Sequence, residues 1–177
     1  MKLYVIRHGE TNVNVKNLIN GRNMIGLNKN GKRQAVEAGN IISKLDIDLI
    51  ICSPLRRTAQ TCRLINKNKV KVIYDRRIME RDAGNMQFRT NNVIDTSLWY
   101  DINKDVIYKN TEGFKSVLNR ATEVIQEIKT KYDGNSILLV THGDFSKAIR
   151  AHILGLTDSK EIRECSQKNC EILEYDI

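Results

Sequence analysis

The sequence is poor in residues that mark several classes of protein. Proline occurs once in 177 residues, at Pro54, and aromatic residues make up 6% of the chain. With 41% apolar and 28% charged residues, the composition is that of an ordinary globular protein, and disorder is not expected. The longest apolar runs have about five residues, whereas a membrane-spanning helix needs about 20. We therefore expect no contact with a membrane.

The sequence also lacks the patterns that are typical of metal sites and of secreted proteins. Its four cysteines contain no C-x-x-C, and its three histidines show no ligand spacing, so we expect neither a metal site nor a cofactor. Met1 and Lys2 lead directly into a strand-like segment instead of a signal peptide. The expected location is the cytoplasm.

Positive charge is abundant, with a net charge of +8. Residues 1–40 hold seven lysines and arginines against two glutamates, and such a field attracts anions. Nucleic acid is one candidate, but the low aromatic content and the lack of a basic helix make it unlikely as a partner. A small phosphorylated molecule is the favoured partner, and the oligomeric state is unknown.

Apolar runs and helical periods alternate along the chain, which is long enough for a single domain over residues 1–177. This alternation predicts a three-layer α/β/α sandwich with a mostly parallel central sheet. The segment from Asp75 to Glu112 is polar and lacks a clear period, and we expect Trp99 and Tyr100 within it to pack locally. The predicted strands are Leu3–Ile6, Asp48–Cys52, Val70–Tyr74, Ser136–Val140 and Glu171–Asp176; the predicted helices are Asn28–Leu45, Leu55–Asn66, Phe114–Ile128 and Asp144–Leu154.

Two of these strands end in the same short pattern. The first runs into Arg7-His8-Gly9 and the fourth into Thr141-His142-Gly143. In open parallel sheets reactive groups gather at the carboxyl ends of strands. A single histidine at a strand end is more often structural than catalytic, but two with the same neighbours favour a catalytic site.

Further charged residues follow the second and third strands. Arg56 and Arg57 come shortly after the Asp48–Cys52 strand and point about 100° apart on a helix, so one can face the site while the other faces solvent. Arginine presents a rigid fork that suits phosphate. Glu80 follows the next strand, where a carboxyl group could protonate a leaving group. Alone, each of these residues also fits an exposed surface position.

In this order, the motifs resemble those of the histidine phosphatase superfamily, the phosphoglycerate mutase-like proteins, over the full length of the chain. The resemblance rests on Arg7-His8-Gly9-Glu10-Thr11 with Asn14, Asn20-Gly21, Ser53-Pro54-Leu55-x-Arg57-Thr58-x-Gln60-Thr61, Glu80 before Gly84, and Thr141-His142-Gly143.

The resemblance implies that His8 is a nucleophile that becomes phosphohistidine and that Glu80 is the proton donor. It implies that Arg7, Arg57 and His142 complete the phosphate pocket. Catalysis of this kind needs positioning and positive charge rather than a metal. The guanidinium of Arg7 disfavours protonation of the attacking His8.

The resemblance also implies contacts of three further residues with the substrate. Asn14 matches a further phosphate contact, and Asn20 and Gly21 match a loop that touches the substrate. The amide of Gly143, at the start of a predicted helix, could bind an anion.

Two departures from the family pattern bear on the substrate. Residues 22–28 replace an Asp-x-Pro-Leu-Thr stretch, and the lid segment, about residues 84–113, is shorter than that of dedicated mutases, with Glu112 in the position of the glutamate of a Gly-Glu-Ser motif. A short lid admits water and favours hydrolysis. The expected activity is a metal-independent phosphatase for a small phosphomonoester. The alternatives are a phosphoglycerate mutase or other phosphotransferase and, less favoured, a phosphate-binding regulator without turnover.

Overall fold

The computed structural model describes residues 1–105 and 108–177, so that two residues of the predicted lid segment lie outside the described residues. Its centre is a five-stranded sheet in the order β3-β2-β4-β1-β5. The first four strands along the chain run parallel, and β5 pairs with β1 in the opposite direction. The predicted mostly parallel sheet is therefore confirmed. The strands are β1 (Lys2–Arg7), β2 (Leu49–Cys52), β3 (Val72–Tyr74), β4 (Ser136–Thr141) and β5 (Ile172–Asp176).

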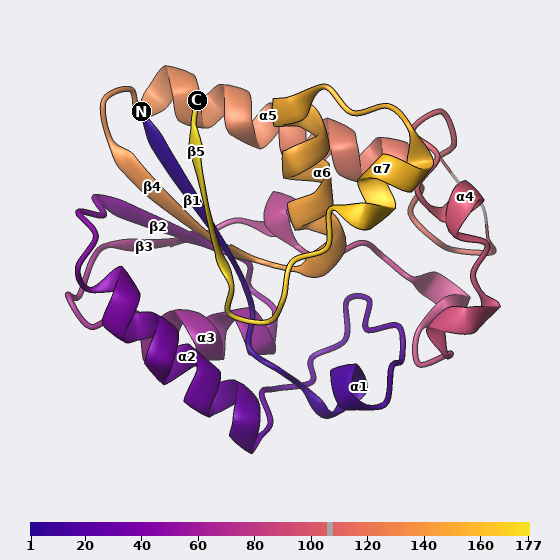
Figure 1. The fold of residues 1–177 in the computed structure, drawn as a ribbon, viewed down its shortest axis with the longest axis horizontal. Helices are drawn as coiled ribbons and strands as arrows, with labels where there is room; N and C mark the ends of the chain where they lie inside the picture. Colours follow the sequence, from indigo (N-terminus) through magenta and orange to yellow (C-terminus); the bar gives the residue numbers. More distant parts are fainter. Residues whose placement is uncertain (106–107) are drawn as a thin grey trace.

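Long helices cover both faces of the sheet, which gives the predicted three layers (Figure 1). Helices α2 (Lys29–Ile42) and α3 (Arg56–Ile65) pack on one face, and α5 (Phe114–Lys131) and α6 (Gly143–Leu154) pack on the other. Alternate side chains of each central strand enter the two cores. This two-sided burial is why the central strands read as continuous apolar runs rather than as alternating ones.

Local signals explain where the long helices begin and end. The Asn28 side chain accepts a hydrogen bond from the Gly31 amide at 2.7 Å and caps α2. Helix α6 ends at Gly155, whose φ of 66° belongs to the left-handed region that favours glycine. Helix α3 begins at Arg56, one residue later than predicted.

The chain also forms short elements that the periodicity did not predict. They comprise α1 (Asn12–Val15), α4 (Thr96–Trp99), α7 (Ser159–Glu164) and the 3-10 turns η1 (Arg76–Ile78), η2 (Gly84–Met86) and η3 (Asn91–Val93). Segments of three to six residues cannot show a helical period, which requires at least two turns. Three of these elements lie between Gly84 and Trp99, in the predicted lid segment.

The register of the sheet brings the two histidine motifs together. Arg7 on β1 is paired with Thr141 on the adjacent β4, so His8 and His142 leave the sheet side by side at the same edge. On the other side of β4, Cys52 at the end of β2 is paired with Val140, which brings Ser53 to that edge. Among the described residues, no helix is both long and apolar enough to span a membrane.

Candidate active site

His8 and His142 form the floor of the site. His8 is 1% exposed and His142 is fully buried, and their rings meet edge to face with centroids 5.3 Å apart. The Gly9 carbonyl can only accept a hydrogen bond, so the contact of 2.8 Å between it and His8 Nδ1 requires a proton on Nδ1. In a neutral imidazole the lone pair is then on Nε2, which accepts a hydrogen bond from Arg57 Nε at 3.1 Å.

The surroundings keep both imidazoles neutral. Burial and the guanidinium groups of Arg57 and Arg7 hold the pKa of His8 well below its ordinary value. Burial, together with positive neighbours led by Arg57, does the same to the pKa of His142. His142 is therefore a neutral hydrogen-bonding group.

The backbone around His8 is held on three sides. The Gly9 amide donates to Thr61 Oγ1 at 3.0 Å, and Asn169 Nδ2 donates to the His8 carbonyl at 2.8 Å. A Cβ on Gly9 would lie 2.4 Å from the Gly31 carbonyl oxygen at the start of α2. Only glycine permits this close approach, which explains one position of the Arg7-His8-Gly9 motif.

The two neighbouring arginines of α3 have opposite environments. Arg57 is fully buried, while Arg56 is exposed. Besides its contact with His8, the Arg57 guanidinium donates to the carbonyls of Gly21 at 2.8 Å and Asn23 at 3.0 Å. Burial lowers the pKa of Arg57 to about 10, which still leaves it charged at neutral pH. The substrate loop predicted at Asn20 and Gly21 therefore holds this arginine in place.

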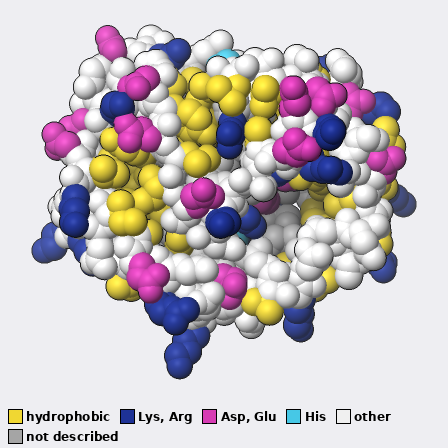
Figure 2. Space-filling view, viewed as in Figure 1, with side chains coloured by type: hydrophobic (Ala, Val, Ile, Leu, Met, Phe, Trp, Pro, Cys, Tyr) yellow, Lys and Arg dark blue, Asp and Glu magenta, His cyan; other side chains and the backbone are white. Residues whose placement is uncertain are grey.

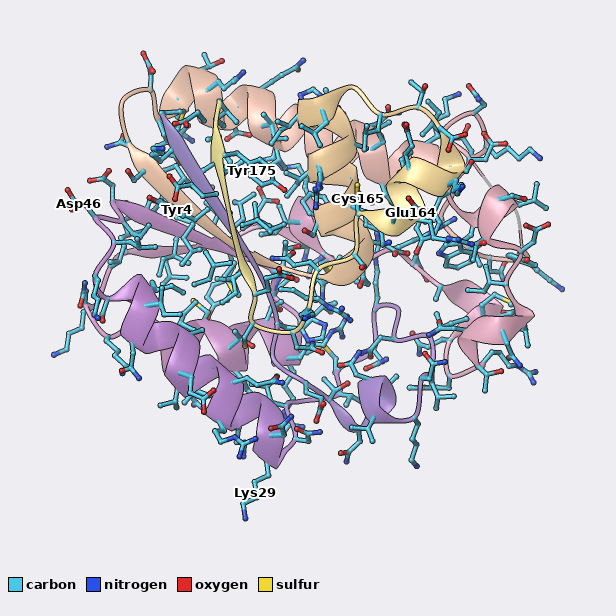
Figure 3. The ribbon with its side chains drawn as sticks, viewed as in Figure 1. Tyr4, Lys29, Asp46, Glu164, Cys165 and Tyr175 are labelled. Atoms are coloured by element: carbon cyan, nitrogen blue, oxygen red, sulfur yellow. The ribbon has the colours of Figure 1, made fainter. Side chains whose placement is uncertain are left out.

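Arg7 is oriented from the end of the chain, which the sequence analysis did not foresee. Its Nη1 donates to the Gln167 carbonyl at 2.7 Å, and the Gln167 side chain donates in turn to the Val5 carbonyl at 2.9 Å. Gln167 belongs to the segment that begins at Cys165, labelled at the end of α7 in Figure 3, and leads to β5. Gln167 contacts Arg7 and Val5 through main-chain carbonyl groups, and no sequence pattern predicts such contacts. Its role depends on the return of the chain to β1.

Glu80 is bound at the start of α6. Its carboxylate accepts hydrogen bonds from the amides of Gly143, Asp144 and Arg81, each at 3.1 Å. Burial, followed by the charge of Asp144, raises the pKa of Glu80, against the opposing effect of Arg57 and Arg7. The expected anion-binding amide of Gly143 is thus occupied by Glu80, whose side-chain oxygens accept hydrogen bonds from the unpaired amides at the start of the helix.

His142 has one ring nitrogen without a partner. Its Nε2 lies 2.8 Å from Ser53 Oγ, while its buried Nδ1 has no hydrogen-bond partner among the described residues. When the Ser53 hydroxyl donates to Nε2, Nδ1 carries the proton of the neutral ring. The site then holds a buried N–H without an acceptor among the residues that the structure describes.

The loop after His8 places the predicted asparagines. Thr11 caps α1 and forms reciprocal hydrogen bonds with Asn14, and Asn20 Nδ2 donates to Thr11 Oγ1 at 3.3 Å. These contacts use the Oδ1 atom of Asn14, which leaves its Nδ2 as the group that it can offer to a ligand. Asn14, Asn20 and Gly21 all line the same pocket.

This pocket has a volume of about 480 Å³, and Figure 2 shows the molecule hollowed at its mouth. Its lining includes Arg7, Glu80 and Gly143, and also Lys147, Arg163 and Ile94. The buried His8, Arg57 and His142 are not among the lining residues. No cluster of three or more metal-binding side chains occurs among the residues that the structure describes.

The lid segment reaches the site through contacts that the sequence did not predict. Trp99 and Tyr100 were expected to pack locally, but both donate hydrogen bonds to the Asp144 carboxylate, at 3.1 Å each. Trp99 also stacks on Arg81, whose Cζ lies 3.6 Å from the ring centre. The buried N–H of a tryptophan and the O–H of a tyrosine usually need hydrogen-bond partners. Here Asp144 of α6, more than 40 residues further along the sequence, is the partner of both.

The chain is similar to known proteins over nearly its whole length. A family model described as the histidine phosphatase superfamily (branch 1) matches residues 3–177. The chain is 29% identical over 189 residues to the uncharacterized phosphatase PhoE of Bacillus subtilis (strain 168), covering 98% of this chain and 93% of that protein. It is 30% identical over 183 residues to the probable phosphoglycerate mutase GpmB of Proteus mirabilis, covering 99% and 85%. The solved structure of the alpha-ribazole phosphatase from Shigella flexneri is similar with a TM-score of 0.85, at 25% identity, over 100% of this chain and 91% of that one.

Proposed function

Because this chain belongs to the histidine phosphatase superfamily, we propose that it hydrolyses a small phosphomonoester through a phosphohistidine formed on His8. It is an enzyme of the phosphoric monoester hydrolase class. We further propose that it acts in the cytoplasm.

The observation that carries the proposal is the tautomer of His8. The Gly9 carbonyl fixes the proton on Nδ1 and so leaves the Nε2 lone pair beside the positive charge of Arg57. Once the Arg57 N–H turns from Nε2 to a phosphoryl oxygen, the lone pair of this neutral, buried imidazole can attack phosphorus. Buried nitrogens of Arg7 and His142 have no partner among the described residues and suit the oxygens of a phosphoryl group.

The proposed reaction has two displacements. His8 Nε2 forms a bond to phosphorus while the phosphorus–oxygen bond to the leaving group breaks, and Glu80 gives its proton to the departing oxygen. Glu80, now a carboxylate, then takes a proton from a water molecule that attacks the phosphohistidine. Phosphate leaves, and His8 and Glu80 return to their starting states. Arg7 and Arg57 stabilise the charge on the phosphoryl oxygens in both steps.

The test combines turnover with trapping of the intermediate. The purified chain is assayed for phosphate release with a panel of phosphomonoesters. The reaction is then quenched in alkali, which preserves a phosphohistidine, and the trapped label is tested for its loss in acid. We expect the label on the wild type and a loss of turnover of at least about 1,000-fold in His8→Ala. His152→Ala is the matched control, because His152 binds Thr122 on α5, away from the site. Turnover by His8→Ala close to the wild-type rate would contradict the mechanism.

Phosphoryl transfer to a second hydroxyl is the alternative function. The 30% identity to a probable phosphoglycerate mutase supports this alternative. Both reactions would use the same His8 and Glu80, so only the acceptor, water or a hydroxyl group, distinguishes them.

A further inference from the structure

A second carboxyl group lies beside Glu80 and has no part in the proposed reaction. Asp144 occupies the first turn of α6, and its amide donates to Glu80 Oε1 at 3.1 Å. Both acids line the same pocket. Trp99 Nε1 donates to Asp144 Oδ2 and the Tyr100 hydroxyl donates to Oδ1, so consecutive residues of the lid segment hold both carboxylate oxygens.

The usual reason for an acid in the first turn of a helix does not account for Asp144. Such residues stabilise a helix through its unpaired amides. Here the amides of Gly143 and Asp144 both bind Glu80 instead. The charge of Asp144 is therefore close to another carboxyl group, an arrangement that costs free energy unless one of the two acids holds a proton.

We propose that Asp144 is a positioning residue for the proton donor: held by Trp99 and Tyr100, its negative charge keeps the proton on Glu80 until the leaving oxygen takes it. This inference rests on the proposed function, in which Glu80 must start the reaction protonated. No step of the proposed reaction explains why Trp99 and Tyr100 of the lid segment bind Asp144 of α6. The inference assigns a role to this contact.

The charges around Glu80 support this assignment. Asp144 faces it from α6, Arg57 from α3 and Arg7 from β1. After burial, Asp144 is the largest cause of the raised pKa of Glu80, and Arg57, the hydrogen bond from the Arg81 amide and Arg7 oppose it. Arg22 donates to the Glu80 carbonyl at 2.9 Å rather than to its carboxylate.

The cations near Asp144 leave its carboxylate without an ion pair. Lys147, one turn further along α6, directs its ammonium to the carbonyls of Ile162 and Arg163. Arg81 donates to the carbonyls of Glu112 and Trp99. Among the described residues, neither cation lies within salt-bridge distance of Asp144. Its negative charge therefore remains available to act on Glu80.

The test compares Asp144→Asn on two substrates that differ in their need for an acid. An alkyl phosphate such as glycerol 2-phosphate requires a proton on its leaving oxygen, whereas p-nitrophenyl phosphate does not. For the alkyl phosphate we expect the basic limb of kcat/KM to move to lower pH by about one unit, with a loss of about tenfold at pH 7. For p-nitrophenyl phosphate we expect rates within about threefold of the wild type.

Two further variants separate this role from a purely structural one. Asp144→Glu keeps the charge and is expected to retain the wild-type basic limb. Glu161→Gln removes a carboxylate charge in the same way in the exposed first turn of α7. It is expected to leave the rates with both substrates and the basic limb unchanged. Asp144→Ser, smaller and uncharged, replaces Asp144→Asn if that variant does not fold, with the same expected shift.

Two results would overturn the inference. If Asp144→Asn slows both substrates equally without moving the basic limb, Asp144 does not act through Glu80. In that case the proposed function stands, because the wild type still hydrolyses both substrates. If the wild type releases phosphate from neither substrate nor from any other monoester, the proposed function fails and this inference fails with it.

Discussion

Three buried side-chain nitrogens have no hydrogen-bond partner among the described residues: Arg7 Nε, Arg81 Nη2 and His142 Nδ1. Each unpaired buried donor costs about 1–3 kcal/mol, so an atom of this kind calls for a partner such as water or a ligand. Two of the three belong to residues that the sequence motifs single out, and Arg81 follows Glu80 directly. At the scale of single residues, the free protein is therefore prepared for an anion.

Arg56 and Arg57 allow a direct test of this preparation. Arg57 donates to His8 Nε2 from a fully buried position, while Arg56 is exposed. Losing a charge-assisted contact to a transferring phosphoryl group costs about 2 to 4 kcal/mol, so we expect kcat/KM to fall roughly 30- to 1,000-fold in Arg57→Ala. Arg56→Ala, the matched control, should stay within a few-fold. Circular dichroism checks that Arg57→Ala is folded, and the reverse order of the two effects would contradict the role of Arg57.

At the scale of secondary-structure elements, the sequence predicted what depends on local pattern. The long helices and buried strands have clear periods, and the equal endings of β1 and β4 correctly placed His8 next to His142. The contacts of Trp99 with Asp144 and of Gln167 with Arg7 were missed, because they join segments far apart in sequence through single polar atoms. A stretch of three- and four-residue elements gives no period from which to infer such contacts.

Glu112 shows how such contacts join separate elements. Its carboxylate binds Arg22 of the substrate loop at 2.9 Å and Arg120 of α5 at 2.8 Å, and it accepts the amide of Asp82 at 3.1 Å. Burial acts to raise the pKa of Glu112, but the hydrogen bond and charge of Arg120 outweigh it and hold the pKa below its ordinary value. The group is therefore charged at neutral pH, and its removal would leave two arginines poorly paired.

We expect Glu112→Gln to lower the free energy of unfolding by about 1–3 kcal/mol and to raise KM more than it lowers kcat. The physical reason is that Arg22, once released from Glu112, no longer fixes the loop that contains Gly21 against the segment of Glu80. Urea unfolding and steady-state kinetics measure the two effects. Glu123→Gln, an exposed position on α5, is the control and should change neither, whereas an equally stable Glu112→Gln would contradict this role.

At the scale of the whole molecule, the buried histidines make stability depend on pH. His8 and His142 have pKa values well below 6.5 when folded, so the unfolded chain binds more protons than the folded one as the pH falls below about 6.5. Their contribution is fully present above that value. It is lost on acidification by up to about 1.4 kcal/mol per histidine and pH unit. The raised pKa of Glu80 acts in the opposite direction, since it favours the folded state as Glu80 takes up its proton.

We therefore expect the unfolding free energy to fall between pH 7 and pH 5.5. The fall should be shallower in His8→Gln and in His142→Gln, because each variant removes one of the two buried imidazoles. Urea titrations at half-unit pH intervals provide the measurement, with His152→Gln as the control for a partly exposed histidine. A slope identical in all four proteins would show that neither buried histidine is kept neutral by the fold.

The size of the pocket bears on whether water or a second hydroxyl group accepts the phosphoryl group from the phosphohistidine. A mutase must keep water away until a hydroxyl group returns, which requires a closed and nearly filled site. The pocket here has about 480 Å³, room for roughly a dozen or more water molecules, and a phosphoglycerate would occupy only part of it. With 3-phosphoglycerate and 2,3-bisphosphoglycerate as primer, we expect negligible formation of 2-phosphoglycerate, together with steady hydrolysis of an aryl phosphate. Isomerisation much faster than phosphate release from every monoester tested would instead assign the same His8 and Glu80 to a mutase. In that case the phosphoryl group would pass from His8 to a hydroxyl group of the substrate faster than to water.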